Sequence, residues 1–373
     1  MQPILVLAFL TAFGVSLVLT AIIRKVAARV GFVDTPAGHK SHRKPTPYGG
    51  GIAIVLTACL VLFGAAFLAR EWRQHPSLFP VPPAIAEDVR RAADTLPLLL
   101  CILGGGLGMA LFGLWDDIRA SRPLQKLIAQ FLVATLMVFS SGVRVSAFIP
   151  WDWAQAAITI LWIVLLTNSF NLLDNMDGLS GTVAFICAGA LLVLALQTMQ
   201  FFIAGFVLTL AGAVLGFLFF NLPPAGIFLG DTGSLFIGYM LATATALTTF
   251  MTREQVNPIF PIFVPLIIFA VPLYDTLSVV AIRLRHKRPI MAGDQNHFSH
   301  RMGRLGMGPR RVLLTVALMT LATALGATVP YGSSTWQALV PAVQALAILA
   351  VIMQLELVSS KVHYGEPGPP AEP

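Results

Sequence analysis

Long apolar runs separated by short polar segments restrict the folds that this chain can adopt. About 20 apolar residues are needed for a helix to cross the hydrocarbon core of a bilayer, where only helices and closed barrels satisfy every backbone hydrogen bond. Hydrophobic residues make up 57% of the 373 positions and charged residues 11%, whereas a soluble domain has about 25% charged residues. The sequence therefore predicts an all-α polytopic integral membrane protein.

The apolar runs predict about eleven transmembrane helices in a single domain, residues 1–360. The tail, residues 361–373, is rich in Pro and Gly, and we expect it to be disordered. The first run lacks the basic segment that opens a signal peptide, so we expect a retained anchor. The candidate spans are residues 3–23, 50–69, 96–115, 125–142, 156–173, 179–197, 200–221, 232–250, 258–282, 311–330 and 336–357.

Basic residues indicate how these spans are oriented. With eleven spans and the N-terminus outside the cell, 18 of the 24 Lys and Arg residues lie on the cytoplasmic side, as the positive-inside rule requires. The sequence thus predicts a cytoplasmic C-terminus. This orientation explains the net charge of +7, and no basic stripe with interleaved aromatic residues indicates a nucleic-acid partner.

Five polar segments contain most of the Asp, Asn and His residues, and the predicted topology places all five at the cytoplasmic side. A carboxylate costs roughly 2.5–3.5 kcal/mol at the centre of a spanning helix, so acids at membrane borders usually have a function. Carboxylates, amides and histidines on one face predict a metal-dependent site for a phosphorylated substrate. The segments are residues 34–51, 113–119, 168–181, 221–235 and 293–304.

An acidic pair, Asp116 and Asp117, ends the third span. Neighbouring helical residues point about 100° apart, so the two carboxylates cannot face one ligand from a regular helix. One is expected to hold a cation or a basic group while the other faces the substrate. The alternative is a membrane-exit pair that balances Arg119 and Arg122.

Polar residues recur every three positions at Asn168, Asn171, Asp174 and Asp177. Residues three apart are neighbours on a helix, but over the whole run their direction drifts by half a turn. A common face therefore requires tighter winding or a break, and Gly178 provides a natural end. The alternative is interhelical hydrogen bonding by the asparagines.

The fourth segment contains F-L-G-D-T-G-S, from Phe228 to Ser234, preceded by Asn221. Glycines on both sides of Asp231 allow the backbone to approach a ligand closely, and a helix start offers free N–H groups to a phosphate. The alternative is that Asp231 caps its own helix.

Two basic loops carry histidines. His297, His300 and Arg301 lie in one, and Lys40 lies in the other, between His39 and His42. The absence of accompanying cysteines favours anion contact over zinc. The alternative is a solvated basic surface that sets the orientation alone.

The motifs D-D, N-x-x-N-x-x-D-x-x-D-G, F-x-G-D-x-G-S and H-x-x-H-R, in this order over roughly residues 30–310, resemble those of the polyprenyl-phosphate N-acetylhexosamine-1-phosphate transferases. The spaced histidines resemble the branch that transfers GlcNAc-1-phosphate to undecaprenyl phosphate. The peptidoglycan enzymes that transfer phospho-MurNAc-pentapeptide have three consecutive His. The family's usual D-G-x-D-G is D-N-M-D-G here, so Asn175 replaces a Gly and the local turn is expected to differ.

The resemblance implies a magnesium-dependent transfer of sugar-1-phosphate from a UDP-N-acetylhexosamine to undecaprenyl or another polyprenyl phosphate. The implied location is the cytoplasmic face of the bacterial cytoplasmic membrane, in an initiating step of cell-envelope polysaccharide synthesis. The resemblance is also compatible with Mn²⁺ in place of Mg²⁺ and with a homodimer. The alternatives are a phospho-MurNAc-pentapeptide transferase and, in a different class, a transporter of anionic substrates, for which midplane sites and repeats are expected.

The resemblance also implies a role for each matching residue. Asp231 matches the metal-binding acid, Phe228 the aromatic that stacks on uracil, and Asn221 an amide that contacts the nucleotide. The candidate catalytic residues are Asp116, Asp117, Asp174, Asp177, His297 and His300. The candidate substrate-binding residues are Lys40, Asn168, Asn171, Asn221, Phe228 and Arg301.

Overall fold

The computed structural model describes residues 2–34, 45–78, 80–145, 149–250, 260–287, 289, 297–329 and 335–364. These residues form fourteen α-helices and one two-stranded hairpin, which confirms the all-α prediction. The helices are α1 (Gln2–Val30), α2 (Gly50–Gln74), α3 (Pro83–Asp94), α4 (Leu96–Ile118), α5 (Pro123–Ser141), α6 (Asp152–Leu173), α7 (Leu179–Gln197), α8 (Phe201–Asn221), α9 (Gly230–Leu247), α10 (Phe260–Ile268), α11 (Ala270–Arg285), α12 (Phe298–Arg304), α13 (Pro309–Thr328) and α14 (Thr335–Tyr364).

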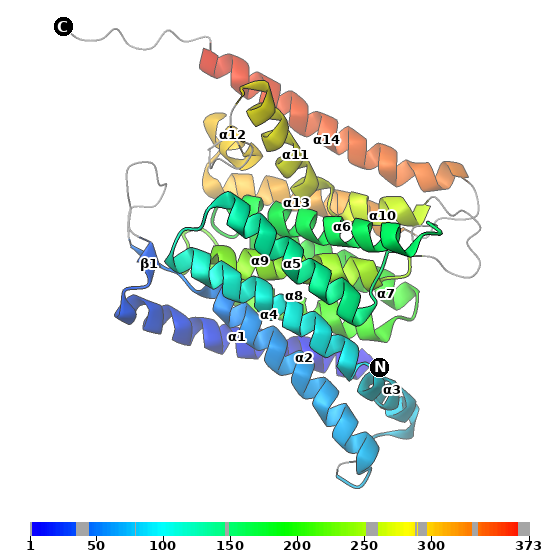
Figure 1. Cartoon of the computed structure of the whole chain (residues 1–373). Helices are drawn as coiled ribbons and strands as arrows, with labels where there is room; N and C mark the ends of the chain where they lie inside the picture. Colours follow the sequence, from blue (N-terminus) through cyan, green and yellow to red (C-terminus); the bar gives the residue numbers. More distant parts are fainter. Residues whose placement is uncertain are drawn as a thin grey trace, which may run out of the picture.

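Most of the long helices run side by side across the view of Figure 1, with α12 and the hairpin at one end of the bundle. Helix α9 occupies the centre, where it packs against α2, α4, α6, α7 and α8. Almost every α9 residue from Gly230 to Thr245 is buried. Because protein surrounds α9, polar residues in it can be satisfied by other helices instead of facing lipid.

Eight helices in the described part of the chain are long and apolar enough to cross a membrane: α1, α2, α4, α5, α6, α7, α8 and α13. Each of the eleven expected spans overlaps a helix, and α14 includes a further apolar stretch, Leu339–Gln354. The count of eleven spans and the orientation of the termini stay predictions, and residues 365–373 of the expected tail lie outside the described residues.

The expected single span at 258–282 is instead two helices, α10 and α11, separated at Phe269. Pro272 explains the break, because proline has no N–H to donate to the carbonyl of Ile268 four residues earlier. The thiol of Cys187 in α7 donates to that carbonyl at 3.4 Å. Cys187 therefore helps to satisfy the carbonyl left free at the break.

The five polar segments meet at one end of the bundle, as far as the structure describes them. The hairpin pairs β1 (Val33–Asp34) antiparallel with β2 (Thr46–Pro47). The N–H of Phe228 donates to the carbonyl of Pro47 at 2.8 Å, and the N–H of Gly50 donates to the carbonyl of Phe228 at 2.9 Å. The first and fourth segments are thus joined through backbone hydrogen bonds.

The glycines around Asp231 bring helices together, and the expectation that they admit a ligand stays a prediction. A Cβ on Gly233 would lie 2.7 Å from the Cα of Gly51 in α2, and a Cβ on Gly230 would lie 2.7 Å from the carboxylate of Asp117. Gly230 also has a positive φ of 73°, which disfavours any side chain. Helix α9 can lie this close to its neighbours only because these positions lack a Cβ.

Replacing Gly51 with Ala should lower the thermal stability of the protein. The new Cβ would meet the backbone nitrogen of Gly233 at 2.1 Å, and overpacking of this kind costs about 1–3 kcal/mol. Gly64→Ala is the matched control, because Gly64 lies in the same helix with nothing within 4 Å of its Cβ position. The measurement is the thermal unfolding midpoint in detergent micelles, and equal midpoints for the two variants would contradict this account of the α2–α9 contact.

Candidate active site

The carboxylate of Asp117, at the end of α4, caps the N-terminus of α9. One oxygen accepts from the N–H of Asp231 at 2.7 Å, and the other accepts from the N–H and the hydroxyl of Thr232 at 3.0 and 2.7 Å. The first N–H groups of a helix have no partner within the helix, and a negative charge there also interacts favourably with the helix dipole. Asp117 therefore sets where α9 begins, and the alternative that Asp231 caps its own helix is wrong.

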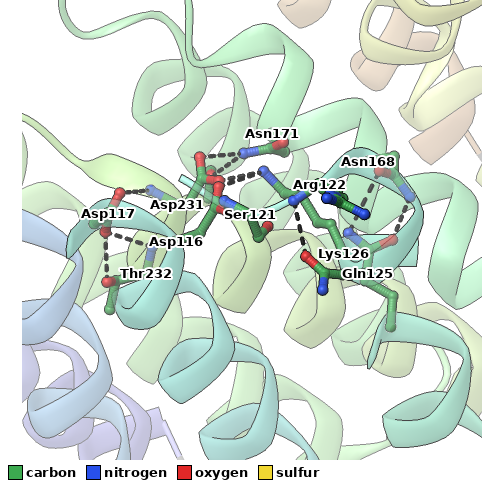
Figure 2. A network of polar contacts seen from close by, with 12 residues as sticks. Asp116, Asp117, Ser121, Arg122, Gln125, Lys126, Asn168, Asn171, Asp231 and Thr232 are labelled. Atoms are coloured by element: carbon green, nitrogen blue, oxygen red, sulfur yellow. Dashed lines mark hydrogen bonds and ion pairs between the residues drawn. The ribbon is translucent and has the colours of Figure 1, made fainter. Parts of the chain in front are cut away.

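Asp116 points toward a lysine at the start of α5. The ammonium group of Lys126 forms an ion pair with Asp231, and it also contacts Asp116 at 3.4 Å (Figure 2). The N–H of Ser121 donates to the other oxygen of Asp116 at 2.7 Å. The two neighbouring acids thus diverge, and Asp116 holds a basic group as expected, whereas the second acid, Asp117, is turned toward α9 instead of being left to face a substrate.

Asn171 completes the environment of Asp231. Its side-chain amide donates to the second oxygen of Asp231 at 2.7 Å and contacts the hydroxyl of Ser234 at 3.0 Å (Figure 2). Helices α4, α5, α6 and α9 each contribute a side chain, so Asp116, Lys126, Asn171 and Asp231 form one polar centre between four helices. We call these four residues the acid–lysine centre.

The four polar residues spaced by three do not share one face. Asn168 exchanges hydrogen bonds with the buried Gln130 of α5, so the interhelical interpretation is correct for this asparagine. Helix α6 ends at Leu173, ahead of the expected end at Gly178, which has a φ of 72° and directly precedes α7. The break frees Asp174 and Asp177 from the helix and turns them toward the fourth segment.

Carboxyl groups from three of the polar segments lie close to one another around the turn after α6. Loss of hydration on burial raises the pKa of Asp174 well above its usual value, and the carboxylates of Asp231, Asp117 and Asp177 raise it further. This part of the site therefore holds carboxylates in a poorly solvated environment, a condition that favours the approach of a cation.

A pocket of about 880 Å³ is lined by residues from four of the five polar segments, including Phe228, three residues before Asp231, but by none of the four residues of the acid–lysine centre. Its volume lies within the roughly 300–1,000 Å³ of small-molecule sites. The half-buried ring of Phe228 lies on its wall and meets the ring of Tyr48 edge-on, with centroids 5.9 Å apart. The lining residues are Thr46, Asn175, Met176, Asp177, Pro223, Pro224, Ala225, Phe228, His300, Gly308, Pro309, Arg310 and Arg311.

Asn221 lies inside the protein and does not line this pocket. Its side-chain oxygen accepts from the N–H of Gly178 at 2.9 Å, and its amide donates to the carbonyl of Ile227 at 2.8 Å. Only 4% of the residue is exposed. The expectation that Asn221 contacts a nucleotide is therefore corrected to a bridge between the two loops that form the pocket wall.

The histidine motif divides between the pocket and the interior. His300 lines the pocket. His297 is buried, with its Nδ1 atom 2.8 Å from a carboxylate oxygen of the fully buried Asp275, and Arg301 is buried and donates to the hydroxyl of Ser278 at 2.8 Å. The side chains of His297 and Arg301 are thus directed toward α11, and their expected contact with the substrate stays a prediction.

Sequence reasoning missed Lys126, Gln130 and Asp275. In the sequence, Lys126 is only one of the basic residues that indicate the orientation of the spans, and nothing in the sequence singles out Gln130. Asp275 did give a signal, because a carboxylate within the apolar run 258–282 is costly unless it has a partner. Lys40, a predicted substrate contact, lies outside the described residues.

The donor set suits a hard divalent cation. Mg²⁺ in phosphate-handling sites usually takes one or two carboxylates, with substrate phosphates and water completing its shell. Asp116 and Asp231 supply such carboxylates around one ammonium group. Within the described ranges, no group of three or more His, Cys, Asp or Glu side chains is arranged to hold a metal ion by itself. The residues present therefore fit an ion that is shared with a phosphorylated substrate.

These features define an α-helical membrane protein with an acidic, lysine-containing centre and a pocket whose volume is in the range of small-molecule sites. A family model described as glycosyl transferase family 4 matches residues 99–249. The chain belongs to this family of polyprenyl-phosphate sugar-1-phosphate transferases, as the following relatives show.

A relative from Bacillus subtilis (strain 168), named probable undecaprenyl-phosphate N-acetylglucosaminyl 1-phosphate transferase, is 30% identical over 94% of this chain and 90% of its own length. The decaprenyl-phosphate N-acetylglucosaminephosphotransferase of Mycobacterium tuberculosis (strain ATCC 25618 / H37Rv) is 30% identical over 87% of this chain and 81% of its own. A phospho-N-acetylmuramoyl-pentapeptide-transferase of Halalkalibacterium halodurans is 31% identical over 80% of this chain and 89% of its own. The resemblance drawn from the motifs is confirmed at the level of the family.

Replacing Asp117 with Asn should destabilise the protein more than replacing Asp116 with Asn. The first change removes the charged acceptor of three hydrogen bonds at the start of α9, each worth about 1.5–3 kcal/mol when a charged group is involved. The second change affects a partly exposed ion pair and one loop N–H. The measurement is the thermal midpoint of both variants in matched micelles, and a wild-type midpoint for Asp117→Asn would contradict the capping role.

Proposed function

We propose that this protein transfers GlcNAc-1-phosphate from UDP-GlcNAc to undecaprenyl phosphate or another polyprenyl phosphate at the cytoplasmic face of the bacterial cytoplasmic membrane. The observation that carries the proposal is the acid–lysine centre at the ends of helices, and a pocket whose wall includes Phe228, three residues before Asp231, supports it. The family membership and the name of the Bacillus subtilis relative support the same substrates. A homodimer stays a prediction of the resemblance.

The chemistry is one exchange of phosphoanhydride bonds. An oxygen of the lipid phosphate attacks the phosphorus attached to the sugar, the bond to the bridging oxygen breaks, and UMP leaves with the electron pair. A phosphate monoester has a second pKa near 6, so at pH 7 the acceptor is already largely ionised and needs little help from a base. Orientation and charge neutralisation are the main tasks of the protein in phosphoryl transfer.

Lys126 and Asp116 are suited to these tasks. The ammonium group lies between two carboxylates and can also contact an anionic phosphate, as a charged donor does with a charged acceptor. Asp116 lies at the last turn of α4, where a lipid headgroup leaves the apolar layer. Asn171 holds Asp231 in a fixed orientation from the opposite side.

Asp231 and Asp116 are the residues that would hold Mg²⁺, or Mn²⁺ in its place. When bound, the ion would supply positive charge to the diphosphate oxygens. In the structure, the ammonium group of Lys126 supplies positive charge to both carboxylates. Phe228 provides an apolar face on which a uracil ring can stack, and Asp177 and His300 lie on the same pocket.

Two alternatives make different predictions. A phospho-MurNAc-pentapeptide transferase has support from the Halalkalibacterium halodurans relative, but the spaced histidines of this chain resemble the GlcNAc branch. A transporter of anionic substrates would have its polar residues near the bilayer midplane. In this protein the acid–lysine centre and the pocket lie where helices begin and end.

The proposal is tested by UMP release from purified protein with undecaprenyl phosphate and a panel of UDP-sugars. We expect release from UDP-GlcNAc that requires a divalent cation and is abolished by Asp231→Asn, because the amide keeps the size but loses the charge that a hard cation needs. Asp152→Asn is the matched control, since Asp152 forms an exposed ion pair with Arg144. Preferred turnover of UDP-MurNAc-pentapeptide would establish the first alternative, and no UMP from any donor would refute the proposal.

Phe228→Ala should raise the KM for UDP-GlcNAc more than it lowers kcat. Stacking of an aromatic ring on a base is worth about 1–3 kcal/mol, and a uracil far from the reacting phosphorus contributes mostly uniform binding. Steady-state kinetics of Phe228→Ala and Phe228→Trp provide the measurement, with partial recovery expected for Trp. A large loss of kcat at unchanged KM would indicate that the ring only packs against Tyr48.

A further inference from the structure

A second buried carboxylate, outside the acid–lysine centre, holds the short helix α12. Asp275 lies in α11 and is completely buried. One of its oxygens accepts from the N–H of Phe298 at 2.9 Å, and the other lies 2.8 Å from Nδ1 of His297. An ionisable residue inside a membrane helix is costly unless it is paired. Both of these contacts connect α11 with the beginning of α12.

Two further hydrogen bonds hold the next residues of α12. Arg301 donates to the hydroxyl of Ser278, one turn after Asp275 on α11. The hydroxyl of Ser299 donates to the side-chain oxygen of Asn175 at 2.5 Å, in the turn that carries Asp174 and Asp177. Positions 297, 298 and 301 thus contact α11, and position 299 contacts the turn after α6.

His300 is the residue between these anchors that lines the pocket. Helix α12 has seven residues, and isolated helices shorter than about 12–15 residues are marginal in water. Its orientation is therefore determined by its tertiary contacts. A pairing of Nδ1 with a carboxylate also fixes which ring nitrogen of His297 carries a proton and how the ring is turned.

We propose that Asp275 is a positioning residue for the transfer reaction: it holds α12, through His297 and Phe298, so that His300 faces the bound nucleotide diphosphate. The inference rests on the proposed function for the identity of the ligand. Asn175 adds a second anchor, which the Gly usual at this position of the family motif could not provide, since Gly has no side chain to accept from Ser299.

The test is a double-mutant cycle between two residues on different elements, Asp275→Asn and His300→Ala. We expect His300→Ala to lower kcat/KM for UDP-GlcNAc roughly 10- to 100-fold in the wild-type background, as the loss of a charge-assisted hydrogen bond does. Asp275→Asn should lower it by a similar factor. In the double variant, the additional effect of His300→Ala should fall below about threefold, because a histidine that is already displaced from the diphosphate no longer contributes to kcat/KM.

A role limited to stability would give a different result. Asp275→Asn would then lower the thermal midpoint, but the effect of His300→Ala would be the same in both backgrounds. Thr276→Val is the matched control, because Thr276 is buried in the same helix and its hydroxyl donates to the carbonyl of Pro272 within α11. It should leave the effect of His300→Ala unchanged. Additive losses in the Asp275 cycle would overturn the proposal.

Hydrogen exchange over residues 297–304 gives a readout that needs no substrate. Asp275→Asn should speed exchange in α12 while α4 and α9 keep their protection, whereas unchanged exchange in α12 would refute the anchoring. If Asp275→Asn does not fold, Ser299→Ala removes the other anchor and should give the same non-additivity to a smaller degree. If wild-type protein releases no UMP from any UDP-sugar, the proposed function fails, and the exchange experiment still decides whether Asp275 anchors α12.

Discussion

The capping of α9 by Asp117 is the interaction on which the site depends. A helix that begins inside a protein-filled membrane region exposes N–H groups that have no water to bond, and a carboxylate from a neighbouring helix satisfies them. Because this contact sets the first residue of α9, it also sets the position of Asp231. Asp275 likewise accepts from the first N–H of α12, so two acids each hold the start of a helix that carries a candidate functional residue.

The placement of the site at the ends of helices suits the substrates proposed for it. A polyprenyl phosphate has its chain in the bilayer and its charge at the border, whereas a nucleotide arrives from water. The acid–lysine centre lies between four helix ends, and the wall of the pocket of about 880 Å³ includes Phe228, three residues before Asp231. Two carboxylates face one ammonium group. They would therefore favour the binding of a further cation together with an anionic substrate.

How far the site could be predicted differs from residue to residue. Asp116, Phe228 and His300 were placed together from their motifs, and the structure brings them to one end of the bundle. Asn221 and His297 belong to the same motifs but have their polar atoms directed into the protein. A motif shows that a residue type is required at a position, but it does not separate contact with a ligand from support of its neighbours.

The sequence by itself determined the helices and the end of the bundle at which polar groups gather, because hydropathy over about 20 residues is a local property that the bilayer selects. Only the tertiary structure decided that Asp117 caps α9 and that Lys126 pairs with Asp231, because those contacts join residues more than 100 positions apart in the chain. The burial of Asp275 likewise depends on what α12 places against it, and α7 provides the thiol that bonds the carbonyl left free at the break. Local patterns specify elements, whereas the pairing of buried polar groups is fixed by packing between elements.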